Sequence, residues 1–235
     1  MQLRPAVVLA LVLAAAAPAP AAPANPLWSK AVESASLAKQ WSPGEMRLVI
    51  EMADDAGKVL DTWDNRYRLS PGEDGAVRTD VVSASRNGKD ETRKEREAQA
   101  KRDRSARTDG EPPMGGFGVD PFDPGLQGSV EIRPLAGNRQ IAGRTCVAFA
   151  FSLTQPKNSV LEGTAWLDAE SGLPVEFVSS LRPLPRGVHE MSTTVRYTDG
   201  FVSEVRVEGS GSLLFLRRRF VSVVTLGGWF RLPGG

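Results

Sequence analysis

The fold class is decided by the segment RQIAGRTCVAFAFSLTQPKNSVLEGTAWLDAESGLPVEFVSSL, which runs from Arg139 to Leu181. It contains three short runs rich in β-branched and aromatic residues, and turn residues separate them. The first run alternates in size, with Val147, Phe149, Phe151 and Leu153 on one face and Cys146, Ala148, Ala150 and Ser152 on the other. This alternation predicts strands of an antiparallel sheet that packs on its bulky face.

Similar alternating runs recur through the rest of the chain. Met46–Met52 and Lys58–Leu69 predict a hairpin, and Ala76–Ala84 predicts a third strand. From Ser129 onward the predicted strands follow one another closely, and Asp199-Gly200 is a strong hairpin signal. About ten strands without β–α alternation predict a mainly β (α+β) fold, a strongly curved antiparallel half-barrel.

Arg217-Arg218-Arg219 interrupts the last long run, which spans Ser212–Leu226. Consecutive arginines cannot all face a core, so this strand is predicted to be bulged or to lie at an edge of the sheet.

Two segments have helical features. Pro26–Trp41 predicts a short amphipathic helix, because Trp28, Val32, Ala35 and Ala38 recur at spacings of three and four. We expect it to pack on the sheet, and a role as a lid is the alternative. Gly88–Arg107 has alanines as its only apolar residues and predicts a charged insertion, helical or disordered, that adds nothing to the core. Contact with anionic lipid head groups or a partner is the functional alternative for that insertion.

A Pro/Gly-rich loop is expected over Glu111–Gln127. Its Asp120 and Asp123 lack the spacing of a calcium loop, so they are interpreted as turn-forming residues. Phe117 and Phe122 are expected to plug a groove or to pin the loop.

The first 24 residues predict a signal peptide. Arg4 precedes an apolar stretch, and Ala22-Pro23-Ala24 forms a small-residue cleavage site. Residues 25–235 are therefore expected to form one domain that is exported to the periplasm and has no transmembrane anchor after cleavage.

Composition excludes several classes of function. The chain has 29 Lys and Arg against 28 Asp and Glu residues, and this balance argues against nucleic acid as a partner. With one cysteine, Cys146, and one histidine, His189, neither an intramolecular disulfide nor a usual zinc site can form. Asp61 with Asp64, or Asp120 with Asp123, are the nearest approach to an acid–base pair, and no pattern indicates a cleft around them. We expect no catalytic residues, no metal, no cofactor and no enzymatic activity.

The strand–turn–strand Gly163-Thr164-Ala165-Trp166-Leu167-Asp168 and Glu170-Ser171-Gly172-Leu173-Pro174 resembles a pattern of the periplasmic outer-membrane lipoprotein carrier (LolA/LolB-like) superfamily. Ile141-Ala142-Gly143-Arg144 and the strand Val147–Leu153 are also similar. The resemblance covers the C-terminal half and the N-terminal helix.

This resemblance implies a lipid- or lipoprotein-binding protein of the carrier or sorting type, which holds acyl chains in an apolar concavity. The expected wall residues of that cavity are Leu48, Ile50, Trp63, Tyr67, Phe149, Phe151, Trp166 and Phe177. The alternative is an envelope sensor or protein-interaction module with a filled core and an envelope protein as its partner.

Overall fold

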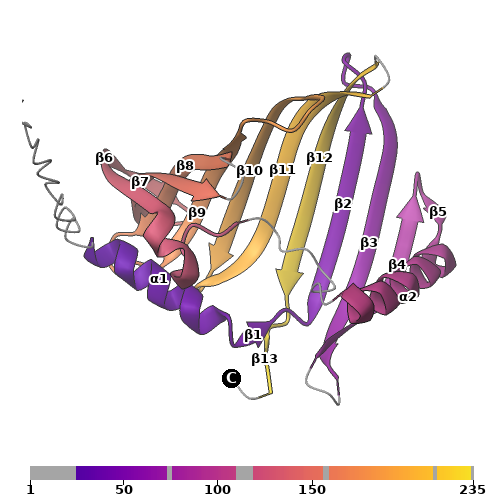
Figure 1. Ribbon diagram of the computed structural model, residues 1–235, viewed down its shortest axis with the longest axis horizontal. Coiled ribbons are helices and arrows are strands. Elements are labelled where there is room, and N and C mark those ends of the chain that lie inside the picture. Colours follow the sequence, from indigo (N-terminus) through magenta and orange to yellow (C-terminus); the bar gives the residue numbers. More distant parts are fainter. Residues whose placement is uncertain (1–24, 73–75, 110–118, 156–158, 214–215, 234–235) are drawn as a thin grey trace, which may run out of the picture.

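The computed structural model describes residues 25–72, 76–109, 119–155, 159–213 and 216–233. The expected signal peptide and Phe117 lie outside these residues. The described part forms an open, strongly curved antiparallel sheet of eleven strands and a separate two-stranded sheet (Figure 1). In spatial order, the strands of the main sheet are β5 (Lys89–Asp90), β4 (Val77–Arg86), β3 (Val59–Pro71), β2 (Glu45–Ala53), β12 (Leu216–Gly227), β11 (Phe201–Leu213), β10 (Val188–Thr198), β9 (Pro174–Arg182), β8 (Ser159–Asp168), β7 (Arg144–Gln155) and β6 (Val130–Ile141). The predicted half-barrel is thus confirmed.

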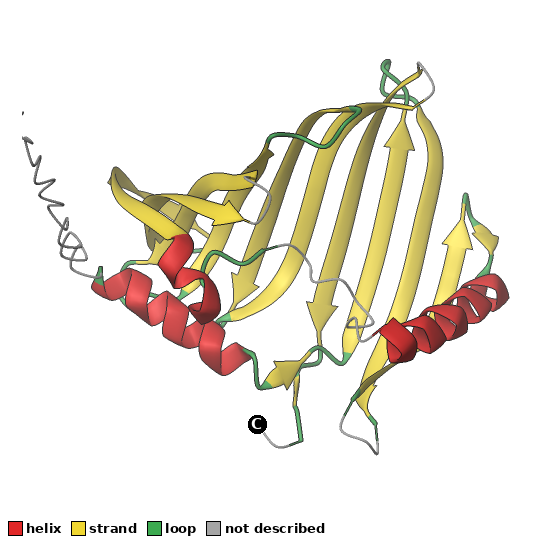
Figure 2. Cartoon of the chain, viewed as in Figure 1, coloured by secondary structure: helices red, strands yellow, loops and turns green. Residues whose placement is uncertain are grey.

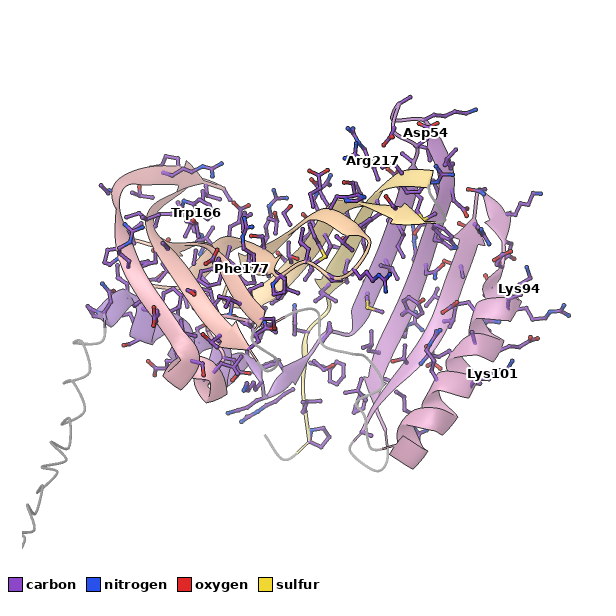
Figure 3. All side chains as sticks on the ribbon, turned by 45° about the horizontal axis from the view of Figure 1, so that its top comes forward. Asp54, Lys94, Lys101, Trp166, Phe177 and Arg217 are labelled. Atoms are coloured by element: carbon purple, nitrogen blue, oxygen red, sulfur yellow. The ribbon has the colours of Figure 1, made fainter. Side chains whose placement is uncertain are left out.

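Strand β12 lies in the middle of the sheet, between β11 and β2, and the prediction of a bulged or edge strand is wrong. Its register is unbroken on both sides, from Arg219 opposite Ala53 to Gly227 opposite Glu45 on β2. The arginines are accommodated because they lie near the hairpin end of the sheet, where Arg217 is exposed close to the turn that contains Asp54 (Figure 3).

Helix α1 (Pro26–Ala38) begins with a well-defined cap. The side chain of Asn25 accepts hydrogen bonds from the backbone N–H groups of Leu27 and Trp28, and Pro26 occupies the first turn, where no N–H partner is needed. The helix ends before the predicted Trp41, which belongs to β1 (Trp41–Ser42) and pairs with β13 (Phe230–Arg231). The two-stranded sheet thereby fixes the end of α1 beside the C-terminal segment.

The motif turn between β8 and β9 docks against α1. Asp168 Oδ1 accepts hydrogen bonds from the backbone of Glu170 and from the backbone and hydroxyl of Ser171. Gly172 follows at a φ of +77°, and a Cβ there would lie 2.9 Å from the Lys30 side chain. Only glycine fits both the left-handed backbone and the close approach of the helix.

Helix α2 (Thr92–Asp109) and the short helix η1 (Pro124–Ser129) complete the described helices. Figure 2 shows α1 and η1 together at one end of the sheet and α2 at the other. The charged insertion is only partly solvated. Helix α2 packs on β4 and buries Gln99. Lys94 and Lys101 lie on its outer side (Figure 3). Lys94 Nζ pairs with Glu91 Oε1 at 2.8 Å on this exposed side.

None of the helices in the described ranges is both long enough and apolar enough to cross a membrane.

Candidate apolar binding site

One row of side chains crosses the concave face of the sheet. Directly opposite residues on antiparallel neighbours project to the same face. The register therefore aligns, from β8 to β4, the residues Ala165, Phe177, Val195, Val205, Val224, Leu48, Asn65 and Ala84. All except Asn65 are apolar, so this row forms a nearly continuous apolar strip across the concave face, whereas the adjacent inward-facing row contains Ser179, Thr193 and Ser222.

The end of this strip beneath α1 and η1 is filled. The ring of Trp28 lies 4.8 Å from that of Phe122, and further ring contacts link Trp28 to Phe149 and Phe151. Phe151 in turn meets Phe177 edge-on at 5.9 Å. All five rings are buried, so this region is a hydrophobic core rather than a cavity.

The opposite end is closed by polar contacts from α2. The Tyr67 hydroxyl donates a hydrogen bond to Glu95 Oε1 at 3.1 Å and accepts one from Asn65 Nδ2 at 3.1 Å. Burial raises the pKa of the Tyr67 hydroxyl. Arg102 pairs with the same Glu95 carboxylate, and Arg96 Nε donates to the carbonyl of Val81. These contacts hold α2 on the sheet and satisfy the hydrogen-bonding groups of Tyr67 and Val81 beneath it.

An apolar pocket of about 160 Å³ lies on the inner side of the filled core. It is lined by Pro43, Val119, Asp120, Phe177, Val195, Tyr197, Val202, Val205, Leu226 and Trp229. A cavity of this size and polarity holds one benzene-sized apolar group without water. The pocket thus has room for a short length of alkyl chain, and Val224 and Leu48 continue the apolar strip beyond it.

Asp120 and Tyr197 are the polar residues of this pocket. Asp120 Oδ1 accepts a hydrogen bond from the backbone N–H of Phe122 at 2.8 Å, and burial raises the pKa of the carboxyl to about 6. The Tyr197 hydroxyl is buried beside this carboxyl but makes no hydrogen bond of acceptable geometry. Burial also raises the pKa of Tyr197 well above its ordinary value, so the hydroxyl is neutral.

The neighbouring Asp123 has a different environment. Its carboxylate caps η1 by accepting from Gly125 N, and it pairs with Lys39 Nζ at 2.7 Å. The hydrogen bond from Lys39 lowers the pKa of Asp123. Both aspartates therefore form turns as predicted, but only Asp120 enters the pocket.

The convex face is polar. Arg196 lies between Glu176 and Glu204, and Arg47 makes a bidentate pair with Asp64. Its pairs are arranged across neighbouring strands, where they stabilise the solvated side of the sheet by modest amounts. Among the described residues, no group of three His, Cys, Asp or Glu side chains is placed to hold a metal ion.

Seven of the eight predicted wall residues lie on the concave face, and one does not. Leu48, Ile50 and Trp63 lie on the part of the concave face between the described helices, Tyr67 lies beneath α2, and Phe149 and Phe151 belong to the filled core; of the seven, Phe177 also lines the pocket. The prediction for Trp166 is wrong. It pairs with Ala148 and Glu176 on the convex face, where Arg139 stacks over its ring at 5.5 Å.

The sequence reasoning missed most of the pocket, including Val195, Tyr197, Val205 and Leu226. The alternation within β10 and β11 marks Val195 and Val205 as inward-facing, so these two residues were predictable from the sequence. Asp120 carried a weaker signal, because its position beside Phe122 in a loop does not reveal that the loop folds over the sheet.

Comparison with protein-family models and with curated proteins finds no match. Comparison with solved structures does find similar chains. A LolA superfamily protein from Nitrosomonas europaea has 11% identity and a TM-score of 0.36, over 89% of this chain and 93% of that chain. A putative outer membrane lipoprotein-sorting protein domain from Vibrio parahaemolyticus has 13% identity and a TM-score of 0.36, over 88% and 94%. The first of these two proteins is described as a member of the LolA superfamily, which the sequence resembles.

A further similar structure is that of the Pseudomonas aeruginosa MucA/MucB complex, with 12% identity, a TM-score of 0.26, and coverage of 88% of this chain and 98% of that chain. At TM-scores this low, the similarities carry no information about the binding site.

Proposed function

We propose that the mature chain is an exported periplasmic protein that binds acyl chains of lipid or lipoprotein on the concave face of its sheet. The observation that supports this is the pocket beside Phe177, because its walls are apolar and it opens onto a floor of apolar side chains. Transfer of each methylene group from water to such a surface gains about 0.8 kcal/mol. A pocket of about 160 Å³ holds part of a chain, and the row of apolar side chains beside it supports the remainder.

Binding without catalysis is the simplest role for this site. Asp120 and Tyr197 are the titratable groups among its lining residues, and they interact with each other. We therefore assign the pocket no reaction.

Native mass spectrometry tests the function directly. Protein purified from its own periplasm without detergent is expected to carry an adduct of lipid mass, and its N-terminus is expected to be Asn25. An apo mass, together with no binding of the uncharged probe N-phenyl-1-naphthylamine, would contradict the proposal.

A pair of valine variants localises binding of that probe. Val202→Phe fills the pocket, because Val202 is half-buried in its wall. Val223→Phe makes the same change on the convex face, next to the inward-facing Val224. The first variant is expected to abolish probe binding and the second to preserve it. Equal effects of the two variants would place the probe elsewhere.

A second candidate, an envelope protein-interaction module, is favoured by an exposed groove along α1. The groove lies between α1 and the turns before Leu173 and Phe201, and has a volume of about 480 Å³. Leu37 is 58% exposed in it and Trp41 is 37% exposed. A photo-crosslinking residue at position 37 is expected, under this alternative, to form an adduct with one envelope protein in cells. The same residue at exposed position 78 serves as the control.

A further inference from the structure

A groove with a volume of about 490 Å³ lies on the convex face, on the other side of the sheet from the apolar strip. Strands β12, β2, β3 and β4 run side by side here (Figure 1). The side chains of Arg47, Arg66 and Arg68 line the groove, and the alternation along β2 and β3 directs them away from the concave face. Val82 also lines it and is 48% exposed, because a bulge in β4 leaves Val82 without a partner on β3. The groove therefore combines three cations with an apolar contact.

Two of these arginines lie directly opposite each other. Arg47 on β2 is opposite Arg66 on β3, and like charges in this arrangement destabilise a sheet. Asp64 compensates Arg47, to which it is joined by two hydrogen bonds of 2.9 and 2.7 Å. Arg66 is exposed and forms no ion pair among the described residues. The guanidinium of Arg66 is therefore available to a ligand.

Hydroxyl groups flank the two arginines in the same row. Thr225 on β12 is opposite Arg47, and Ser83 on β4 is opposite Arg66, so all four side chains project to the convex face. A guanidinium has five N–H donors in a planar fork, and a hydroxyl adds one O–H donor. The row is therefore a line of hydrogen-bond donors that crosses four strands.

The carboxylates near the groove leave it with a positive charge. Glu45 lines the groove opposite Arg68, and Asp80 lies opposite Arg68 on the other neighbouring strand. Neither carboxylate forms an ion pair with Arg68 in the described part of the chain. The lining thus holds three cationic side chains and one anionic side chain, and Asp64 is already bound to Arg47. A groove with this balance of charge attracts anions.

We propose that this groove binds a phosphate group, which is held by the guanidinium of Arg66 with Arg47 and Thr225 as further donors. An arginine binds phosphate through two parallel N–H···O bonds, and a phosphate has oxygens left for a second arginine and a hydroxyl. Val82 contacts the apolar part of the same ligand. The site goes beyond the proposed function, because it lies on the opposite face from the apolar pocket. A lipid head group and a soluble phosphate ester share this chemistry, and the experiment separates them.

Titration of the isotope-labelled mature protein with glycerol phosphate, followed by NMR, tests the site directly. Saturable amide shifts are expected around Arg47, Arg66 and Thr225, and glycerol at the same concentration is expected to cause none. Cosedimentation with phosphatidylglycerol vesicles then identifies the source of the phosphate. Vesicle binding that glycerol phosphate competes away assigns a lipid head group, whereas shifts with glycerol phosphate but no vesicle binding assign a soluble ester.

Three variants separate a specific site from a general effect of charge. Arg66→Gln is expected to weaken glycerol phosphate binding by about tenfold or more, because hydrogen bonds from a charged donor are the strong ones. Arg66→Lys keeps the charge but loses the planar fork, so its affinity is expected to fall between those of the wild type and Arg66→Gln. Arg133→Gln makes the same charge change at an exposed position of β6 outside the groove and is expected to leave binding unchanged.

The inference is overturned if the shifts spread over the surface instead of the groove, or if Arg133→Gln weakens binding as much as Arg66→Gln. It is also overturned if a protein that is folded by circular dichroism shows no shifts at all. Acyl binding is measured separately, with N-phenyl-1-naphthylamine, and the wild type and Arg66→Gln are expected to bind this probe equally. Failure of the phosphate site with intact probe binding therefore leaves the proposed function standing.

Discussion

The indole ring of Trp28 packs against the ring of Phe122 with their centroids 4.8 Å apart. The indole N–H of Trp28 also donates a hydrogen bond of 2.9 Å to Gln127 Oε1. Gln127 belongs to the short helix η1, which follows Phe122. This pair joins α1 to the loop that carries Asp120, so the position of the pocket's polar end depends on the packing of a helix residue far away in sequence.

The variant Trp28→Ala, which removes the indole ring, is expected to destabilise the protein strongly. Trp28 is 5% exposed, and truncation of such an aromatic residue costs about 3–5 kcal/mol. The exposed Leu37 of the same helix provides the control, and Leu37→Ala is expected to change the free energy of unfolding by less than about 0.5 kcal/mol. Urea denaturation measures both. Similar values for the two variants would contradict the packing described here.

Asp120→Asn is expected to stabilise the protein at neutral pH. Because the folded-state pKa is raised to about 6, the folded chain binds this proton more strongly than the unfolded chain, and stability falls as the pH rises from about 4 to about 6. The asparagine variant avoids this loss, which amounts to at most about 3 kcal/mol. Its advantage should vanish below pH of about 4, as measured by urea unfolding across the pH range.

Asp123→Asn is expected to behave in the opposite way. The pKa of Asp123 is lowered by Lys39, so its carboxylate stabilises the folded state at neutral pH and the contribution is lost as the pH falls through that lowered pKa. The variant should therefore be less stable than the wild type at pH of about 7 and should approach it in acid. The same sign for both aspartates would show that their environments have been misassigned.

Gly172→Ala is expected to cost more than Gly57→Ala. Both glycines have a left-handed backbone, with φ values of +77° and +83°. A Cβ at Gly57 meets nothing within 4 Å, so that variant measures the backbone cost alone, about 1–2 kcal/mol. At Gly172 the Cβ collides with Lys30, which raises the expected loss to about 2–4 kcal/mol. Thermal and urea unfolding of the pair measure the difference.

Glu95→Ala is expected to loosen α2 without unfolding the sheet. Glu95 joins the Tyr67 hydroxyl to Arg102, whereas Glu97, on the outer side of α2, pairs with Arg93 at 3.9 Å. Hydrogen exchange of the α2 amides should accelerate by about tenfold or more in Glu95→Ala and change little in Glu97→Ala. Unchanged protection in both variants would mean that other contacts hold the helix.

The fold was predictable because its main signal is local. The alternation from Val147 to Leu153 needs no information from elsewhere, and a period of two permits no other regular structure. The error at Trp166 has the opposite origin. Alternation shows that Trp166 faces away from Ala165, but only the register between β7 and β8 shows that Ala165 shares its face with Phe149.

The pocket was less predictable, because its walls come from segments that are distant in the chain. Pro43, Asp120, Val205 and Trp229 meet only after the sheet curves and the loop folds over it. The strand alternation identifies which residues face inward, but it cannot indicate how far the concave face is covered. That depends on α1 and α2, which lie at the two ends.

The pairing of β2 with β12 also limits the order in which the strands of the sheet can pair during folding. The hairpin of β2 and β3 is synthesised early, yet its free edge has no partner until Arg219–Gly227 emerge near the end of the chain. Closing so long a loop is slow compared with forming hairpins, so this contact is expected to come late in folding. A chain translocated from its N-terminus would expose that unpaired edge until its last strand arrived, and would depend on protection from aggregation during that interval.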